Sequence, residues 1–380
     1  MSYPPLILVF HCPAGGGHKA AADAVAEAAR RRGLDAEVVD ALSLTPPWFS
    51  RAYVGAHFAG SERAPALYGH AYQALDWRAP IADGLRCGFD RALGVGVKRF
   101  VAARSPTAVV ATHFFPMEVL GHERLRGRLR VPIVGVVTDH RAHAFWAERG
   151  IDRFCTPAGR PPRDLVRHGI SPAAIVATGI PVRAAFGAIP ALVVPRSGEP
   201  LRVLVTSGGF GIGPVTEVVR SFAGLSGVEL VVVCGDNPGR ADRVARVAAE
   251  LRIAARVVGF ERDMPARMAE AHVLVGKPGG LTVSESLAAG RPMILVGTCP
   301  GQEASNEQWL LANGAALSVR PGAVGRAVWG LRHGDRLASL ALAARDLGAP
   351  DAADRVVDVA LHAAGSVAAR AGSPRLSTAA

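Results

Sequence analysis

The stretch that decides the fold is GKPGGLTVSESLAAGRPMIL, residues 276–295, which follows His272–Val275, an apolar run expected to be a buried strand. The segment Pro278–Gly280 predicts a turn without bulky side chains, and a helix is expected to begin at about Thr282. The first N–H groups of a helix have no partner within it, so this helix end is suited to bind a diphosphate. This strand, turn and helix are typical of a doubly wound parallel sheet.

The same alternation continues along the chain in two blocks, separated by the proline-rich segment Pro181–Pro200. The expected strands are Leu6–Phe10, Asp35–Asp40, Ala108–Thr112, Ile133–Thr138, Phe154–Thr156 and Ile175–Thr178 in the first block, and Leu201–Thr206, Glu229–Cys234, Ala255–Val258, His272–Val275 and Pro292–Val296 in the second. The predicted fold is therefore α/β, with two Rossmann-like, doubly wound parallel-sheet domains that face a central cleft. The expected boundaries are a first domain over 1–182, a linker over 183–200, a second domain over 201–348, a helix over 349–365 and a disordered tail over 366–380.

The composition suits a compact globular protein, because 49% of the residues are hydrophobic and 20% are charged. The net charge of +11 favours acidic partners such as nucleic acid, anionic lipid or a phosphorylated substrate, although a compositional bias explains it equally well. Five scattered cysteines predict reduced thiols in a cytosolic protein. No apolar run approaches the ~20 residues needed to span a bilayer, so any membrane contact is expected to be peripheral.

Three side chains near the glycine turn could recognise a nucleotide sugar. Glu285 lies one turn into the expected helix, where a carboxylate can accept two hydrogen bonds from a ribose diol. Gln302 and Glu303 lie on a second loop at the carboxyl edge of the sheet, where they could contact sugar hydroxyls. The alternative is an ordinary helix start with a glutamate near its N-terminus, which is common in α/β proteins.

A second glycine loop, Gly15–Gly17, precedes His18 and another helix N-terminus. Glycines let the backbone approach a ligand closely, and an imidazole is a suitable general base for an acceptor hydroxyl. The alternative for His18 is a helix-capping role without chemistry. Asp139 follows an expected strand and could orient His18, act as the base itself, or serve only as a cap or turn carboxylate.

These motifs together resemble glycosyltransferase family 28, and within it the monogalactosyldiacylglycerol synthases and processive diacylglycerol glucosyltransferases. The residues that carry the resemblance are the 276–295 stretch, PGQEASN at 300–306, Gly15–His18, Val137–His140 with Trp146, Gly179–Arg183, Thr206–Gly209 and Gly259–Phe260. Their order agrees with the family from about Leu6 to Gly314. The resemblance implies a GT-B fold with an acceptor-binding first domain and a second domain that binds a UDP-hexose.

The resemblance also assigns residues to the donor. It implies that Glu285 holds the ribose, that the sugar contacts Gln302 and Glu303, and that Phe260 lies against uracil, with a core aromatic as the alternative for Phe260. Backbone N–H groups would meet the diphosphate at Gly279, Gly280, Leu281 and Thr282. The remaining donor residues that it implies are Gly17, Ser207, Gly208 and Gly209.

The mechanism implied is a single displacement with inversion, in which His18 removes the acceptor proton and helix N-termini stabilise the departing UDP. No Asp-x-Asp segment follows a strand in the manner of a metal site. We therefore expect no cofactor and no metal, and activity that resists EDTA.

The segment Leu44–Trp77 mixes aromatic and basic residues, a composition that suits a membrane interface. The candidate acceptor or membrane contacts are Trp48, Phe49, Tyr53, Tyr68 and Tyr72. The alternative is a pair of amphipathic helices whose rings pack inward. The resemblance implies a lipid acceptor, diacylglycerol, and a cytoplasmic enzyme bound peripherally to the anionic inner face of the cell membrane.

Other functions fit the sequence less well. The same fold could act on a cell-wall lipid intermediate or a small natural product, or it could be a UDP-sugar epimerase. A nucleic-acid-binding protein is disfavoured, because the sequence has no zinc-ligand spacing, basic helix or RNA-binding aromatic strand motif. A dehydrogenase is disfavoured because the first strand and turn lack G-x-G-x-x-G.

Overall fold

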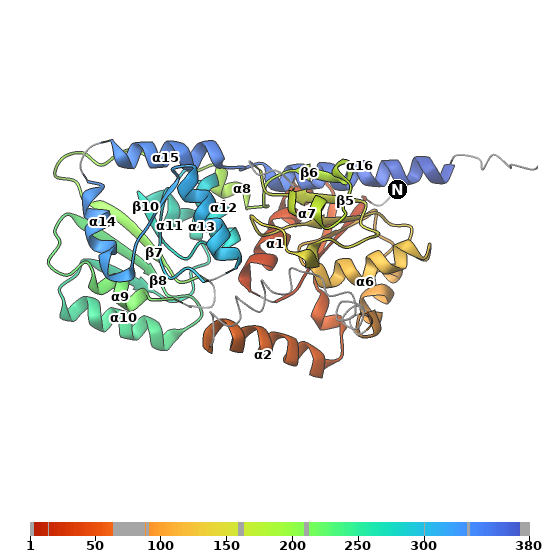
Figure 1. The fold of residues 1–380 in the computed structure, drawn as a ribbon, viewed down its shortest axis with the longest axis horizontal. Coiled ribbons are helices and arrows are strands. Elements are labelled where there is room, and N and C mark those ends of the chain that lie inside the picture. Colours follow the sequence, from red (N-terminus) through yellow and green to blue (C-terminus); the bar gives the residue numbers. More distant parts are fainter. Residues whose placement is uncertain are drawn as a thin grey trace, which may run out of the picture.

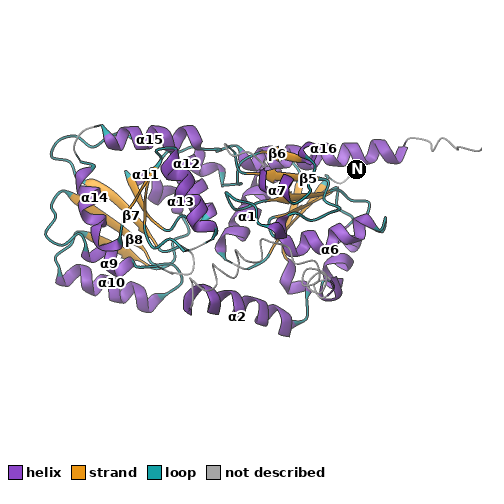
Figure 2. Ribbon diagram, in the orientation of Figure 1, coloured by secondary structure: helices purple, strands orange, loops and turns teal. Residues whose placement is uncertain are grey.

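The chain folds into two lobes, each built on its own parallel sheet (Figure 1). The structure is a computed structural model that describes residues 4–13, 15–63, 88, 91–158, 163–208, 213–299, 301–332 and 335–372. Within these residues, the strands form two six-stranded sheets, and helices cover them on the outside (Figure 2). The predicted α/β class with two doubly wound sheets is confirmed.

The first lobe is built on a sheet with the strand order β2-β1-β3-β4-β5-β6. Its strands are β1 (Leu6–His11), β2 (Asp35–Asp40), β3 (Ala108–Ala111), β4 (Ile133–Val136), β5 (Arg153–Thr156) and β6 (Ile175–Ala177). Because β1 lies between β2 and β3, the order reverses there, and this is where such sheets bind ligands at their carboxyl edge.

The second lobe is built on a sheet with the order β12-β11-β10-β7-β8-β9. Its strands are β7 (Leu201–Thr206), β8 (Val228–Val233), β9 (Ala255–Val258), β10 (Val273–Gly276), β11 (Met293–Leu295) and β12 (Ala316–Ser318). The reversal falls between β7 and β10. The sequence did not predict β12, a three-residue strand too short to give a pattern.

Helices cover both faces of each sheet. The helices whose first residues lie in the first half of the chain are α1 (Gly16–Arg31), α2 (Pro47–Arg63), α5 (Val95–Arg104), α6 (Phe114–Leu125), α7 (Arg163–Arg167) and α8 (Ala184–Gly187). The others are α9 (Val215–Arg220), α10 (Pro238–Glu250), α11 (Met264–Glu270), α12 (Gly280–Ala288), α13 (Gln302–Ala312), α14 (Val324–Gly330), α15 (Arg336–Leu347) and α16 (Ala352–Gly372). Side chains from α1, α16 and the first sheet form one continuous buried cluster.

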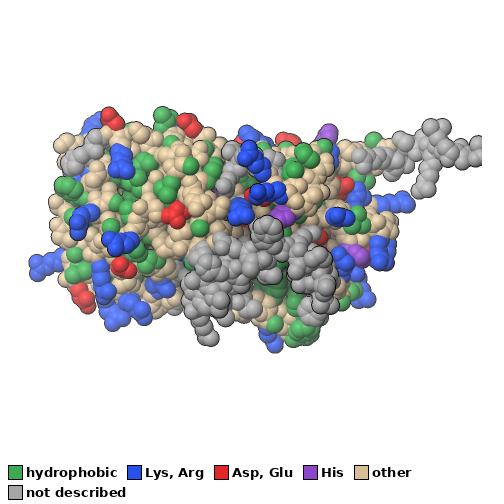
Figure 3. All heavy atoms as spheres, viewed as in Figure 1, with side chains coloured by type: hydrophobic (Ala, Val, Ile, Leu, Met, Phe, Trp, Pro, Cys, Tyr) green, Lys and Arg blue, Asp and Glu red, His purple; other side chains and the backbone are tan. Residues whose placement is uncertain are grey.

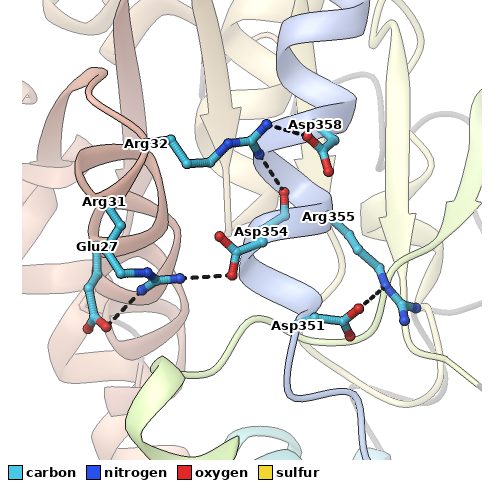
Figure 4. A network of polar contacts seen from close by, with 7 residues as sticks. All are labelled: Glu27, Arg31, Arg32, Asp351, Asp354, Arg355 and Asp358. Atoms are coloured by element: carbon cyan, nitrogen blue, oxygen red, sulfur yellow. Dashed lines mark hydrogen bonds and ion pairs between the residues drawn. The ribbon is translucent and has the colours of Figure 1, made fainter.

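The last helix returns to the first lobe. Helix α15 packs against α12 in the second lobe, whereas α16 packs against α1, β3, β4 and β5. Val356 and Val357 of α16 are fully buried in this contact. Figure 4 shows the polar rim of the contact, where Arg31 donates to Asp354 and Arg32 donates to Asp358. Such exposed pairs contribute at most about 1 kcal/mol each, so the buried valines hold the helix in place.

Helix α16 is longer than the sequence analysis expected. It continues to Gly372 instead of ending at 365, so residues 366–372 are helical and not a disordered tail. Gly365 does not stop the helix, because the alanines and Arg370 that follow are strong helix formers. The rest of the expected tail lies outside the described residues.

The chain crosses between the lobes twice, and the two crossings touch. A Cβ atom added at Gly179 would lie 2.5 Å from Cβ of Ala349, and one added at Gly187 would lie 2.5 Å from Cβ of Pro350. Real Cβ atoms do not approach so closely, so both positions require glycine for this packing.

The basic side chains are spread over the visible face of both lobes in Figure 3. The net charge of +11 is therefore not gathered into one patch on this face.

Among the helices that the structure describes, none is both long enough and apolar enough to cross a membrane.

Candidate active site

The candidate site residues gather where the two sheets reverse their strand order. In the first lobe, α1 begins just beyond β1, and Thr112 follows β3 directly. In the second lobe, Ser207 follows β7, and the turn Lys277–Gly279 follows β10. These are the positions at which doubly wound sheets place their ligands.

The N-terminus of α12 has no side-chain cap. Gly279 occupies the N-cap position, and no side chain of the cap residue bonds to the first turn. Helix α12 begins at Gly280, two residues before the expected start at Thr282, because the extended backbone of Gly279 already leads into the helix. Buried Asn306 holds the turn in place, with its side-chain amide donating to the carbonyl of Pro278 at 2.8 Å. The first N–H groups of a helix have no partner within it, so this end suits an anion.

The two lobes meet at this helix end. A Cβ atom added at Gly280 would lie 2.2 Å from the main-chain oxygen of Thr138, so only glycine allows this approach. Nearby, a Cβ atom added at Gly17 would lie 3.3 Å from Cδ2 of Leu281. The side chain of Leu281 therefore packs on α1, while its main chain belongs to the first turn of α12. The two glycine-rich loops thus converge across the lobe interface.

His18 lies in the first turn of α1, which begins at Gly16. Its Nδ1 atom is 2.6 Å from the main-chain oxygen of Thr112 and 3.1 Å from Oγ1 of Thr138. A carbonyl oxygen can only accept, so Nδ1 carries the hydrogen, and Nε2 of the neutral ring is the atom that can accept a proton. The ring also meets the edge of His113, with the centroids 4.7 Å apart.

Asp139 bridges the lobes instead of orienting His18. Its carboxylate accepts a hydrogen bond of 2.6 Å from Nε2 of Gln302 and another from the indole of Trp146. Burial raises the pKa of the Asp139 carboxyl to about 7, which the Trp146 hydrogen bond partly opposes. Nδ1 of His18 contacts the oxygens of Thr112 and Thr138 in this structure, whereas Asp139, which the sequence offered for orienting His18, contacts Gln302 and Trp146.

Glu285 lies in α12 and is only partly exposed. Burial raises the pKa of its carboxyl to about 7, whereas the nearby positive charge of Arg183 lowers it. Arg183 also donates to the main-chain oxygen of Arg262, close to Phe260 in the sequence. A buried carboxylate whose pKa is raised in this way is a candidate for a binding or catalytic role.

Glu303 is occupied within the second lobe. Its Oε1 atom lies 3.0 Å from Nζ of Lys277, and its Oε2 accepts a hydrogen bond of 2.8 Å from the main-chain N–H of Cys299. The carboxylate thus ties the turn after β10 to the loop before α13.

In the described part of the chain, no group of three or more His, Cys, Asp or Glu side chains could hold a metal ion.

The remaining donor candidates lie around the second sheet. Ser207 is buried, and its hydroxyl donates to the oxygen of Val233, while Gly208 adopts a φ of 72° with open space beside it. Gly209 lies outside the described residues. Phe260 is 61% exposed, so the alternative that it is a core aromatic is wrong.

The aromatic segment divides into an inner and an outer part. Trp48 is 57% exposed, but Phe49 is buried against Phe115, with the ring centroids 6.0 Å apart. The expectation that Phe49 faces a membrane is therefore wrong, because it completes the core of the first lobe. Tyr53 is partly buried, and its hydroxyl lies 3.5 Å from Nε2 of His113. Tyr68 and Tyr72 lie outside the described residues.

Three residues that shape this site were not predicted from the sequence: Thr112, Thr138 and Asn306. Each threonine is the last residue of an expected strand, and a polar residue at the end of an apolar run was the available signal. Asn306 closes the PGQEASN motif, but nothing in its spacing indicated the bond to Pro278.

Two carboxylates in the site are expected to lower the stability of the fold. Because burial raises the pKa of Asp139 and of Glu285, the native state binds more protons than the unfolded chain between about pH 4 and pH 7, so the free energy of unfolding falls as pH rises through this window. We expect Asp139→Asn and Glu285→Gln each to raise the free energy of unfolding by about 1–3 kcal/mol at pH 8, allowing for partial exposure.

Denaturant melts at pH 8 and pH 4 check this expectation, with Asp242→Asn on exposed α10 as the control. The increase in the free energy of unfolding of the two variants should disappear at pH 4, where both carboxyls are protonated in the native state. An equal gain at both pH values, or a gain in the control, would contradict it.

Two family models match the chain, one in each lobe. Residues 18–182 match the model of monogalactosyldiacylglycerol (MGDG) synthase, and residues 202–319 match the glycosyltransferase family 28 C-terminal domain. A curated relative, the processive diacylglycerol beta-glucosyltransferase of Bacillus cereus strain AH187, is 26% identical over 370 residues, which cover 94% of this chain and 93% of that protein.

Solved structures share the fold. MurG of Acinetobacter baumannii has a TM-score of 0.63 at 18% identity, covering 94% of this chain and 100% of that one. The S. aureus MnaA structure with UDP has a TM-score of 0.58 at 13% identity, covering 93% and 95%. The expected GT-B fold is confirmed. With both lobes matched, the chain belongs to glycosyltransferase family 28 and has a first lobe of the MGDG synthase type.

Proposed function

We propose that this chain is an inverting hexosyltransferase that moves a hexose from a UDP-sugar to the hydroxyl of diacylglycerol. The observation that carries the proposal is the meeting of the two glycine loops at Thr138, because it sets an uncapped helix end beside a histidine able to accept a proton. The name of the curated relative, a processive diacylglycerol beta-glucosyltransferase, supports this acceptor class.

The donor is held mainly by the second lobe. The diphosphate lies at the N-terminus of α12, where the helix dipole favours negative charge and the N–H groups of residues 280–282 precede the helical bond from Val283 to Gly279. The N–H of Gly279 donates to the oxygen of Lys277 in this structure, so it must exchange that bond for the diphosphate. Glu285 accepts hydrogen bonds from the ribose hydroxyls, and exposed Phe260 lies against the uracil ring. Gln302 and Glu303 face the sugar. Gln302 exchanges its bond with Asp139 for a sugar hydroxyl, and the Glu303 carboxylate accepts a sugar hydroxyl in addition to its contacts with Lys277 and Cys299.

The chemical step is a single displacement. The proton of the acceptor hydroxyl passes to Nε2 of His18 while the oxygen forms a bond to the anomeric carbon from the face opposite UDP. The bond from that carbon to the diphosphate oxygen breaks, and UDP leaves with the electron pair. The N-terminus of α12 stabilises the charge that develops there, which is a role that metal ions fill in other transferases. Activity in EDTA is therefore part of the proposal.

The acceptor approaches the first lobe from a membrane surface. Exposed Trp48 lies in the first turn of α2, and exposed Arg51 follows about one turn later, which pairs an interfacial ring with a cation for anionic lipid. We place the enzyme in the cytoplasm, bound peripherally to the inner face of the cell membrane.

A donor-by-acceptor screen tests the proposal. The purified chain is incubated with UDP-glucose, UDP-galactose or UDP-GlcNAc and with liposomes that contain diacylglycerol and an anionic lipid, with and without EDTA. We expect a glycosyl-diacylglycerol of inverted anomeric configuration, formed equally in EDTA, and flotation of the protein with the liposomes at low salt.

Four outcomes would contradict parts of the proposal. Transfer only to a cell-wall lipid intermediate or a small natural product would change the acceptor. Loss of activity in EDTA that manganese restores would refute metal independence. Failure of the protein to float with the liposomes would contradict binding to a membrane surface. Epimerisation of UDP-GlcNAc in the absence of any acceptor would indicate an epimerase instead of a transferase.

A further inference from the structure

The environment of His18 Nδ1 contains two oxygen atoms from the ends of two neighbouring strands. The carbonyl of Thr112 follows β3, and the hydroxyl of Thr138 follows β4, at 2.6 Å and 3.1 Å from Nδ1. Both threonines are almost completely buried, at 0% and 4% exposure. The two oxygens are therefore fixed by the sheet, and water does not compete for them.

The main chain of α1 is fixed at the same place. The hydroxyl of Thr112 donates to the main-chain oxygen of His18 at 2.9 Å and lies 3.2 Å from the oxygen of Phe10. The backbone and the ring of His18 are thus both tied to the carboxyl edge of the sheet. The Thr112 carbonyl can only accept, so the Nδ1 hydrogen points between this carbonyl and the Thr138 hydroxyl oxygen.

Thr138 also touches the donor side of the site. Its main-chain oxygen packs against Gly280 at the start of α12, while its hydroxyl contacts His18. The neighbouring carboxylate, Asp139, bonds to Gln302 and Trp146. One residue therefore lies between the proposed base and the proposed diphosphate site.

We propose that Thr138 is a positioning residue for His18: its hydroxyl oxygen shares the Nδ1 hydrogen with the Thr112 carbonyl and so keeps Nε2 as the proton-accepting atom. This inference rests on the proposed function for its catalytic consequence. When Nε2 takes the acceptor proton, the ring becomes positively charged, and the two oxygens at Nδ1 stabilise that charge. Thr138 and Thr112 thus fill the place that a carboxylate holds in a catalytic triad.

The test compares Thr138→Val, which keeps the shape but loses the oxygen, with Thr138→Ser, which keeps the oxygen. We expect the valine variant to lower kcat about tenfold, as the loss of one hydrogen bond to a charged group implies, and to leave the Kd of UDP unchanged. The serine variant should retain most of the wild-type kcat. Equal loss in both variants, or wild-type turnover in the valine variant, would overturn the proposal.

A second readout does not depend on activity. Nitrogen-15 NMR of the ring nitrogens reports which one carries the hydrogen in neutral His18, separately from His113 beside it. We expect Nδ1–H in the wild-type protein and in Thr138→Ser. In Thr138→Val we expect a lower but still predominant Nδ1–H population, because the Thr112 carbonyl remains as an acceptor while the Thr138 oxygen is lost. Hydrogen on Nε2 in the wild-type protein would overturn the proposal.

Thr112→Val serves as the matched control. It removes the hydroxyl bonds to the main chain but keeps the carbonyl at Nδ1, so it should lower the melting temperature without changing the hydrogen position. A changed hydrogen position in this variant would assign the effect to the backbone of α1 and not to Thr138. If the hydrogen shifts as expected but His18→Ala turns over normally, the positioning geometry stands and the proposed function fails.

Discussion

Replacing His18 with alanine is expected to lower kcat by about 10²- to 10⁴-fold, the range that a general base contributes. The reason is geometric: Nδ1 is held by Thr112 and Thr138, so Nε2 is the nitrogen that can take the acceptor proton. The donor contacts belong mostly to the second lobe, so the Kd of UDP should stay close to that of the wild-type protein. Initial rates at saturating donor and calorimetric titration with UDP measure the two quantities.

The control for this variant is His362→Ala, a matched substitution on an exposed position of α16. It should leave both kcat and the Kd of UDP unchanged. Turnover near the wild-type value in the His18 variant would eliminate its role as the base and leave Asp139 as the remaining candidate. A joint loss of kcat and UDP binding would instead indicate that the loop had collapsed.

Introducing a carboxylate at Val356 is expected to cause the largest loss of stability. Val356 is fully buried between α16, α1 and the first sheet, in a cluster that also contains Val25 and Val134. An unpaired charge in such a place destabilises by about 3–5 kcal/mol, which is a large part of the 5–15 kcal/mol typical of a folded protein. We expect Val356→Asp to lower the melting temperature by about 6–20 °C, or to prevent folding.

Two further variants make this result interpretable. Val356→Ala keeps the site apolar and should destabilise by about 1–3 kcal/mol, so it remains measurable if the aspartate variant does not fold. His362→Asp adds the same charge to the exposed side of α16 and should be nearly neutral. A wild-type melting temperature for Val356→Ala would show that α16 does not hold the first lobe together.

All strands except β12 could be predicted, because each is an apolar run bounded by glycine, proline or polar residues. The run Leu201–Thr206 agrees with the structure at both ends. The three-residue β12 could not be predicted, since so short a segment has no period. Helix ends were less accurate: α12 starts earlier and α16 ends later than expected, because glycine at either place does not by itself decide where a helix stops.

The location of the candidate site could also be predicted, because its loops follow strands at the reversals of the sheet order. Its internal contacts could not. His18 is 94 positions from Thr112 and 120 from Thr138, and Asp139 is 163 positions from Gln302. The first sheet brings His18 to the two threonines, and the packing of the two lobes brings Asp139 to Gln302. The sequence therefore offered the charged Asp139 as one candidate for orienting His18, but not the two threonines.

The return of α16 to the first sheet has a consequence for synthesis on the ribosome. Domains usually fold in order from the N-terminus as they emerge. Here the apolar face formed by α1 and the first sheet lacks its covering helix until residues 352–372 have emerged, after the whole second sheet. During that interval the nascent first lobe presents unburied valines and alanines, and is a natural client for a chaperone that shields apolar surface.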